Sequence, residues 1–368
     1  MTYRIAAIGG DGIGPEVLAE GLKVLEAVSG DGLRLTFEPA EVGAALYRRT
    51  GEDLPRETLE LCRSADAILF GAAGLPDVRF PDGTEIAPQV TLRFLLDLYA
   101  GVRPIRLYPG VPTPLRLPPD RTIDYVIFRE NVEGLFASRA GGAAVGDDVV
   151  ADTLLVTRKG TARIVRRAFA MAVTRGQTGD RGSRGAAPSG APAAMVTCVD
   201  KANIFRSYAF FRKIFREVAR EFPAVATDFA YMDAMTMYVV QAPWRFDVVV
   251  LENLFGDILS DLGAATVGGL GMAPSGDIGD RWALFQPSHG TAPDIAGRGV
   301  ANPIATILSA AMMLDWLGHR HQDPLAARAA RRIEHAVTTV LEKGTVRTPD
   351  IGGHATTRQV GDAVATAV

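Results

Sequence analysis

Residues 4–28 read RIAAIGGDGIGPEVLAEGLKVLEAV, and this stretch indicates the class of fold. Arg4–Ile8 is a short apolar run closed by glycines, which predicts a buried strand. From Pro15 to Val28 the apolar residues recur at helical spacing, and a proline suits the first turn of a helix. The glycines between these segments therefore lie in a strand-to-helix turn.

The same alternation of strand-like and helix-like segments continues along the chain. Further strands are predicted at Asp66–Phe70, Thr122–Phe128, Ala194–Val199 and Phe246–Leu251. Helices are predicted at Gln89–Tyr99, Arg158–Val173, Ile204–Phe222, Asn302–Leu317 and Pro324–Lys343. This order predicts an α/β fold. Thr174–Pro192 is rich in Gly, Ser, Arg and Pro, and we interpret it as a surface loop.

Composition and charge limit the classes of function. The 368 residues are 48% hydrophobic, which is enough to bury a large core, and the length of the chain indicates about two domains. The net charge of −3 offers no basic field for nucleic acid. We expect a soluble cytoplasmic protein without membrane contact, because there is no signal-peptide pattern and no apolar run of the roughly 18–20 residues that a membrane helix needs. Cys62 and Cys198 are too few for a disulfide framework, so we expect buried thiols.

The glycine-rich turn itself has two interpretations. It resembles a dinucleotide-binding fingerprint, but Gly10, Gly12 and Gly14 are each two residues apart and lack the G-x-G-x-x-G spacing. A tight turn with a purely structural role therefore stays open.

A stronger motif is FGDILSDL, residues 255–262, which places Asp257 and Asp261 four residues apart. On a helix these side chains share one face, with Cβ atoms ~5–6 Å apart. Two bare carboxylates there repel each other, and a divalent cation would remove the repulsion by using both as oxygen ligands. The alternative is a solvated helix face.

Cationic residues also recur beside apolar segments. Arg93 lies on a predicted helix, Arg103 precedes a proline, and Arg129 ends a predicted strand. Guanidinium groups bind carboxylates bidentately, although an ordinary salt bridge explains any single arginine. Lys201 follows a predicted strand, where active sites of α/β proteins lie, and a metal ion beside a lysine favours its neutral, basic form. A merely solvated lysine is the alternative.

A turn-rich loop, PSHGTAPD at residues 287–294, precedes the predicted Asn302 helix. Its backbone is suited to wrap a flat ligand, and Asp294 is suited to accept hydrogen bonds from ribose hydroxyls. An ordinary loop remains the alternative.

Together these segments resemble the isocitrate/3-isopropylmalate dehydrogenase family of β-decarboxylating dehydrogenases. The resemblance rests, in order, on GGDGIGPE, DLYAGVRP, FRENVEGLF, VDKAN, YMDAMTM, ENLFGDILSDL, HGTAPDIAG and ANP, and it covers nearly the whole chain. It implies a two-domain α/β fold that is not a Rossmann domain. The large domain would comprise residues 1–102 and 268–368 with the cofactor loop. The small domain, residues 103–267, would carry a dimer arm and the metal aspartates.

The resemblance also implies roles for individual residues. Arg93, Arg103 and Arg129 match the arginines that bind the substrate carboxylates. Lys201 matches the catalytic lysine, and Asp233, Asp257 and Asp261 match the ligands of Mg²⁺ or Mn²⁺. The family is a homodimer with shared active sites, so Lys201 and Asp233 would act in the partner's site. The cofactor contacts would be His289, Gly290, Thr291, Ala292, Asp294 and Asn302.

Substrate and cofactor preference follow from positions that vary within the family. Asp294-Ile295 stands where NADP-dependent relatives carry Lys-Tyr, and a carboxylate repels a 2′-phosphate, so we expect NAD. Gln89-Val90 replaces the paired leucines of isopropylmalate enzymes and is nearer the Asn-Val of isocitrate enzymes. We therefore expect a malate with a polar 3-substituent rather than 3-isopropylmalate.

The chain departs from the family pattern at two further positions. Phe136 stands where the family has a catalytic tyrosine, and Gln286 stands where isopropylmalate enzymes commonly have glutamate. In the implied reaction Lys201 helps to ionise the substrate hydroxyl, hydride passes to NAD, and the β-keto acid loses carbon dioxide before protonation. Phe136 cannot donate that proton. Two alternatives stay open, namely a hydroxy-acid dehydrogenase with impaired decarboxylation and a regulatory paralogue without catalysis.

Overall fold

The computed structural model describes residues 1–30, 32–178 and 194–368, which form two compact units. Unit 1 comprises Met1–Leu98, Tyr108–Pro112 and Gly268–Val368, and unit 2 comprises Tyr99–Leu107 and Thr113–Val267. The sequence-based division placed residues 99–102 in the first domain. They belong to unit 2 because residues 100–102 lie in the strand Ala100–Arg106, which pairs with another strand of that unit, and the Tyr99 carbonyl accepts the Asn131 N–H. Residues 108–112, which the same division placed in the small domain, belong to unit 1.

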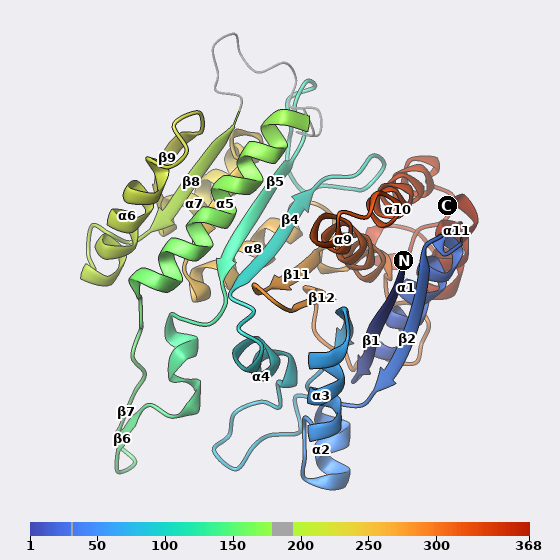
Figure 1. Cartoon of the computed structure of the whole chain (residues 1–368), viewed down its shortest axis with the longest axis horizontal. Helices are drawn as coiled ribbons and strands as arrows, with labels where there is room; N and C mark the ends of the chain where they lie inside the picture. The colour runs from blue at the N-terminus through green and yellow to red at the C-terminus, as the bar shows by residue number, and fades with distance from the viewer. Residues whose placement is uncertain (31, 179–193) are drawn as a thin grey trace. The chain divides into compact units, whose positions relative to one another are not determined.

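Unit 1 is built around a mixed sheet (Figure 1). Its strands are β1 (Thr2–Gly10), β2 (Arg34–Ala40), β3 (Ala67–Ala72), β11 (Pro274–Ile278) and β12 (Ala283–Pro287). They lie in the order β2-β1-β3-β12-β11, in which β11 alone runs antiparallel to its neighbour β12. The predicted opening strand is therefore confirmed, and it lies between two parallel neighbours.

Helices cover both faces of this sheet. They are α1 (Gly14–Val28), α2 (Ala44–Thr50), α3 (Arg56–Ser64), α4 (Pro88–Leu95), α9 (Ile304–His321), α10 (Pro324–Lys343) and α11 (Thr357–Ala367), with short 3₁₀ turns at Leu270–Met272 and Pro349–Ile351. Helices α1 and α9 contact the strands directly, and α10 and α11 pack behind them. On the other face Cys62 of α3 and Leu92 of α4 share a buried cluster with Ile8 and Phe70.

Unit 2 has a sheet of its own strands, β4 (Ala100–Arg106), β5 (Asp124–Glu130), β8 (Met195–Asp200), β9 (Ala226–Tyr231) and β10 (Val248–Leu251), in the order β4-β5-β10-β8-β9. Only β4 runs antiparallel among these strands. Four helices cover the sheet: α5 (Arg158–Thr178), α6 (Arg206–Ala219), α7 (Met232–Gln241) and α8 (Asn253–Ala265). Short 3₁₀ turns lie at Leu135–Ala140 and Pro243–Arg245, and β6 (Ala143–Val145) with β7 (Val149–Ala151) forms a separate hairpin.

The predicted α/β class is confirmed, and most predicted elements are present with shifted ends. Helix α4 ends at Leu95 rather than Tyr99, because Asp97 takes a positive φ of 47° and the N–H of Leu98 turns back to the Arg93 carbonyl. Helix α5 continues to Thr178, so the loop prediction is wrong for residues 174–178. The rest of that predicted loop lies outside the described residues.

The glycine-rich turn after β1 has a structural role, because it connects several segments of unit 1. The carboxylate of Asp11 is buried and accepts N–H groups from Ala44, Ala45 and Gly74 at 2.7, 2.9 and 2.8 Å. Gly12 has a φ of 58°, and a Cβ there would lie 2.1 Å from the Thr291 carbonyl oxygen. The turn therefore holds the start of α2, the chain after β3 and the backbone of the 287–294 loop together.

Two smaller expectations concern cysteines and membranes. Cys62 and Cys198 are both buried free thiols, as predicted. Within the described ranges, no helix combines the length and the apolar character that crossing a bilayer requires.

Candidate active site

Helix α8 carries the paired aspartates, and its start is fixed by Glu252. The carboxylate of this residue accepts the N–H groups of Leu254 and Phe255, which caps the helix. The ring of Tyr208 stacks on Phe255 with centroids 4.9 Å apart, and burial together with the Glu252 carboxylate raises the pKa of the Tyr208 hydroxyl. Burial raises the pKa of Glu252, and the backbone N–H donors oppose that rise. The helix predicted from FGDILSDL is therefore present and anchored at its first turn.

Arg129 lies against this helix because Gly256 leaves room for it. A Cβ on Gly256 would lie 2.6 Å from the Cβ of Arg129. The guanidinium is 1% exposed; its Nε donates to Asn253 Oδ1 at 2.9 Å, and its Nη1 pairs with Asp257. Asn253 was not predicted as a site residue, although an amide at the start of an acidic helix beside an arginine motif is a usable signal.

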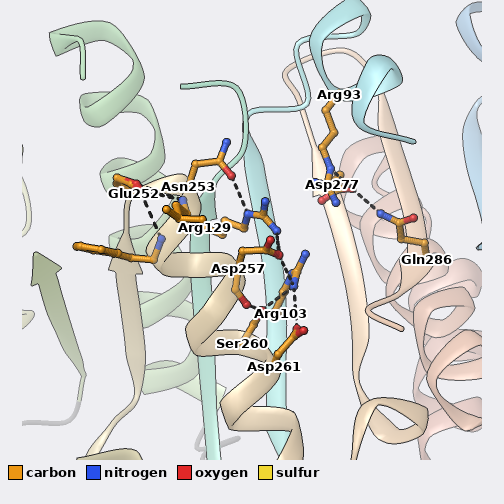
Figure 2. Close-up of polar contacts among 12 residues, drawn as sticks. Arg93, Arg103, Arg129, Glu252, Asn253, Asp257, Ser260, Asp261, Asp277 and Gln286 are labelled. Atoms are coloured by element: carbon orange, nitrogen blue, oxygen red, sulfur yellow. Dashed lines mark hydrogen bonds and ion pairs between the residues drawn. The ribbon is translucent and has the colours of Figure 1, made fainter. Parts of the chain in front are cut away.

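Arg103, on the neighbouring β4, completes the cluster (Figure 2). Its Nη1 donates to Ser260 Oγ at 2.6 Å and lies 3.6 Å from Asp257 Oδ1 and 3.7 Å from Asp261 Oδ1. Two carboxylate oxygens, one turn apart on α8, therefore converge on one positively charged nitrogen. The side chains of Asp257 and Asp261 remain 41% and 54% exposed, so solutes have access to both.

The charges of this cluster oppose one another. Burial raises the pKa of Asp261, and the neighbouring Asp257 carboxylate raises it further. Arg103 and Arg129 lower it. Two cations and two anions give the four side chains a formal charge of zero.

Lys201 and Asp233 form a separate pair in unit 2. Lys201 lies just after β8 and Asp233 in the first turn of α7, and the ammonium pairs with the carboxylate Oδ1. This hydrogen bond lowers the pKa of Asp233. No group of three or more His, Cys, Asp or Glu residues that could hold a metal ion occurs in the described ranges of one chain. The structure therefore brings Asp257 and Asp261 together but does not bring Asp233 to them within one chain.

Arg93 lies in unit 1, on α4, and pairs with a residue that sequence reasoning missed. Its Nε donates to Asp277 Oδ2 at 2.9 Å, and Asp277 on β11 is completely buried. Gln286 on β12 donates to the same oxygen at 2.9 Å (Figure 2). A carboxylate in the wholly buried strand Pro274–Ile278 needs a cationic partner, and Asp277 was missed because this strand was not predicted.

The expected specificity residues lie on the same helix. Gln89 and Val90 are half-buried in the first turn of α4, and Gln89 precedes Arg93 by four residues, so both lie on one helix face. The Oε1 atom of Gln89 is buried and has no hydrogen-bond partner among the described residues. A buried amide oxygen without a partner indicates a position suited to a polar ligand group.

The expected cofactor loop is fixed by its backbone to the glycine-rich turn. The Thr291 carbonyl accepts the Ile13 N–H at 2.8 Å, its hydroxyl donates to the Gly74 carbonyl at 2.7 Å, and Ala292 takes a positive φ of 38°. Gly290 and Asp294 are exposed. The loop therefore presents Asp294 to solvent on a rigid support.

His289 and Asn302 are less accessible than their predicted role suggests. Burial lowers the pKa of His289, although the Gly290 carbonyl and Asp350 oppose it, and its Nε2 is buried without a partner in the part of the chain that is described. Asn302 donates to Asp350 and accepts the Ile304 N–H, each at 3.0 Å, at the start of α9. These bonds give Asn302 a structural role, and its contact with adenine stays a prediction.

Phe136 lies where the family has its tyrosine. It belongs to the 3₁₀ turn Leu135–Ala140, and the guanidinium carbon of Arg129 lies 5.0 Å from the centroid of its ring. The ring therefore packs over a member of the arginine–aspartate cluster but carries no group that can transfer a proton.

Comparison with known proteins assigns the family. The family model described as isocitrate/isopropylmalate dehydrogenase matches residues 4–364. The chain belongs to this family. It is thus a β-decarboxylating dehydrogenase, an oxidoreductase that acts on a hydroxy acid, and the resemblance stated from the motifs is confirmed. Isocitrate/isopropylmalate dehydrogenases generally use NAD or NADP together with a divalent metal.

Individual relatives agree on the family and differ in substrate. The 3-isopropylmalate/3-methylmalate dehydrogenase of Methanocaldococcus jannaschii is 44% identical over 99% of this chain and 98% of its own. The isocitrate/homoisocitrate dehydrogenase of Thermus thermophilus is also 44% identical, over 100% of this chain and 99% of its own. The crystal structure of isocitrate dehydrogenase from Methylococcus capsulatus has a TM-score of 0.83 and 37% identity, covering 99% of both chains, which confirms the predicted fold.

Proposed function

We propose that this protein oxidises a 3-substituted malate and removes its β-carboxylate as carbon dioxide, with NAD as the hydride acceptor and Mg²⁺ or Mn²⁺ as the metal. The observation that best supports this proposal is that Asp257 and Asp261 converge on Arg103, beside the buried Arg129. This cluster combines groups that bind carboxylates with groups that bind a hard cation.

The residues present fit a divalent cation. Two carboxylate oxygens already converge on a single positive charge, the Nη1 of Arg103, and both side chains are accessible. When bound there, the metal would polarise the substrate hydroxyl and carbonyl oxygens as a Lewis acid. The chain's own residues then have separate tasks. Arg93, Arg103 and Arg129 bind substrate carboxylates, and Lys201 helps to ionise the substrate hydroxyl.

We further propose a homodimer in which Lys201 and Asp233 act in the partner's site. On α7, Met237 and Val240 follow Asp233 by four and seven residues, on the same helix face, and are 46% and 44% exposed. Ile258, next to Asp257 on α8, is 53% exposed, and α7 contacts α8. A second copy that covered this apolar face would therefore bury the surface around Asp233.

The oligomeric state of a double variant tests the dimer. Met237→Glu with Val240→Glu should give a monomer in light scattering and abolish activity, because charge is placed on the apolar face. Leu95→Glu, at a residue of unit 1 that is 45% exposed, is the matched control and should stay dimeric. A double variant that remains a dimer would show that this face is not the interface.

The substituent of the malate should be polar. An isopropyl group beside Gln89 would leave the buried amide oxygen without a partner, which costs ~1–3 kcal/mol for a buried polar group. A hydroxyl substituent can donate to that oxygen, whereas a carboxylate substituent, which only accepts, can bond to the amide N–H groups of the same side chain. We therefore favour an isocitrate-like substrate over 3-isopropylmalate.

NAD is favoured over NADP because of Asp294. The carboxylate is exposed at the end of the rigid loop, where it can accept hydrogen bonds from ribose hydroxyls. A 2′-phosphate at the same place would meet a like charge.

A panel assay tests the whole proposal. Substituted malates are offered with Mg²⁺ or Mn²⁺ and with NAD or NADP, and NADH or NADPH formation is followed by absorbance. We expect the highest kcat/KM for a polar or acidic 3-substituent with NAD. A maximum for 3-isopropylmalate refutes the role of Gln89, a preference for NADP refutes that of Asp294, and no turnover of any malate would favour a regulatory subunit.

Phe136 favours a second candidate, a dehydrogenase that releases the keto acid with little decarboxylation. General acids contribute ~10²–10⁴-fold, and phenylalanine cannot supply one. Hydride transfer does not need this acid, so Phe136→Tyr should change the release of carbon dioxide more than the formation of NADH. Both products are measured in the same single-turnover experiment. Matching rates in the wild type, unchanged by the substitution, would show that another group donates the proton.

A further inference from the structure

The surroundings of Arg93 contain one carboxylate and one amide that share a single oxygen. Asp277 Oδ2 accepts both the Nε–H of Arg93 and the Nε2–H of Gln286, each at 2.9 Å. Asp277 is fully buried, and Arg93 and Gln286 are 5% and 7% exposed. Three separate elements, α4, β11 and β12, supply these side chains, so the contacts depend on the fold of unit 1 and not on local sequence.

The chemistry of the three groups requires a single negative charge. The guanidinium is always charged and only donates hydrogen bonds, whereas an ionised carboxylate only accepts them. Gln286 is a neutral donor, so it binds Asp277 without adding charge. A glutamate at this position would place a second carboxylate at hydrogen-bond distance from the first, and the two would repel unless they shared a proton.

The shared oxygen also determines how Arg93 faces its ligand. A guanidinium is planar, with its five N–H groups in a fixed fork, so fixing the Nε–H direction fixes the plane of the whole group. The bond to Asp277 engages only the Nε–H of Arg93, and the N–H groups of its two Nη atoms are not part of it. They remain available for a carboxylate whose position is set by the Arg93–Asp277 bond.

We propose that Gln286 is a positioning residue for substrate binding. Gln286 holds the Asp277 carboxylate in place, and Asp277 in turn fixes the plane of the Arg93 guanidinium. The inference rests on the proposed role of Arg93 in binding a substrate carboxylate. Gln286 lies three residues before His289, so the strand that leads into the expected cofactor loop also supports the substrate arginine. The pair Asp277 and Gln286 must carry one carboxylate and one amide, in either order.

A charge swap tests this requirement. The proteins are the wild type, Gln286→Glu, Asp277→Asn and the double variant that exchanges the two groups. Each single change leaves either two carboxylates or none, and misplacing a binding group by about 1 Å can cost ~10²-fold. We expect KM for the preferred malate to rise roughly 10- to 100-fold in each single variant, while kcat changes by less than about threefold. In the double variant KM should be at least about tenfold lower than in the worse single variant.

A buried substitution beside the pair serves as the control. The Ser309 hydroxyl donates to the carbonyl of Gln286 and does not touch the Asp277 carboxylate. Ser309→Ala should therefore lower the free energy of unfolding without changing KM. Unfolding is measured for every variant, so that a loss of folded protein is not mistaken for a loss of binding.

The outcomes separate this inference from the proposed function. If the wild type oxidises no substituted malate, the proposed function fails and the role of Arg93 fails with it. If the wild type is active but Gln286→Glu lowers stability at an unchanged KM, the pair is merely structural and the inference is overturned. A double variant no better than the worse single variant also overturns it. Recovery of KM in the double variant supports it.

Discussion

Replacing Glu130 by glutamine should stabilise the protein by an amount that grows with pH. Glu130 ends β5 and is 2% exposed, directly after the site arginine Arg129. Its Oε2 accepts the N–H groups of Val132 and Glu133, and its Oε1 is buried without a hydrogen-bond partner in the described chain. Burial raises the pKa of Glu130 from 4.5 to about 8, with the backbone N–H groups opposing the rise.

The sign of the effect follows from which state binds the proton more tightly. Between pH 4.5 and about 8 the folded protein keeps Glu130 protonated while the unfolded chain releases the proton. The wild type is therefore most stable with respect to this group below pH 4.5, and it loses stability as pH rises to about 8. Each pH unit corresponds to about 1.4 kcal/mol. The pH-dependent loss in the free energy of unfolding of the wild type, compared with the glutamine variant, is near zero at about pH 4, roughly 3 kcal/mol at pH 7 and roughly 5 kcal/mol above pH 8.

Urea unfolding of both proteins across this pH range measures the difference. The glutamine variant keeps an oxygen that accepts the same two N–H groups but cannot ionise. The gap in the free energy of unfolding should widen with pH and level off above about pH 8. Glu57→Gln, at an exposed position of α3, is the matched control. A gap that stays constant across the range would refute the argument, because it would mean that Glu130 titrates alike in both states.

Two further predictions concern other carboxylates. Asp11→Ala removes the acceptor of two buried N–H groups and one part-buried N–H group and should cost roughly 3–5 kcal/mol in urea unfolding, whereas a loss below about 1 kcal/mol would show that water replaces the carboxylate. Asp257→Asn and Asp261→Asn should each weaken Mn²⁺ binding in calorimetry by at least about tenfold, and EDTA should abolish turnover. Full activity in EDTA would remove the metal from the mechanism.

Much of the fold was predictable because hydrophobic periodicity reports burial. Helix α10 matches its predicted bounds, Pro324–Lys343, since a proline begins it and a glycine follows it. Strands β11 and β12 were missed, because PSGDI and ALFQP contain polar residues that the buried sheet accepts only through partners distant in sequence. Helix α2 was missed because its cap comes from Asp11, more than thirty residues earlier.

The site was predictable in its motifs but not in its partners. Spacing alone placed Asp257 and Asp261 on one helix face, and the structure has them there. No spacing rule joins Arg93 to Asp277, which lies 184 residues later in the sequence. The contact of Phe136 with Arg129 is likewise tertiary, and it depends on how the chain after β5 folds back over the guanidinium.

The salt-bridge and substrate-binding interpretations of the arginines are compatible once charge is considered. In unit 2 the two arginines and two aspartates sum to zero, and the Lys201–Asp233 pair also sums to zero. A divalent cation alone would leave two positive charges uncompensated, and the two carboxylates of the malate backbone alone would leave two negative ones. Bound together they restore neutrality, with the arginines turning from the aspartates to the substrate. Under the proposed function, metal and substrate should therefore strengthen each other's binding by the same factor, as linkage requires. Calorimetric titration of Mn²⁺ with and without a malate measures that factor, and equal affinities would show that the aspartates remain paired with the arginines.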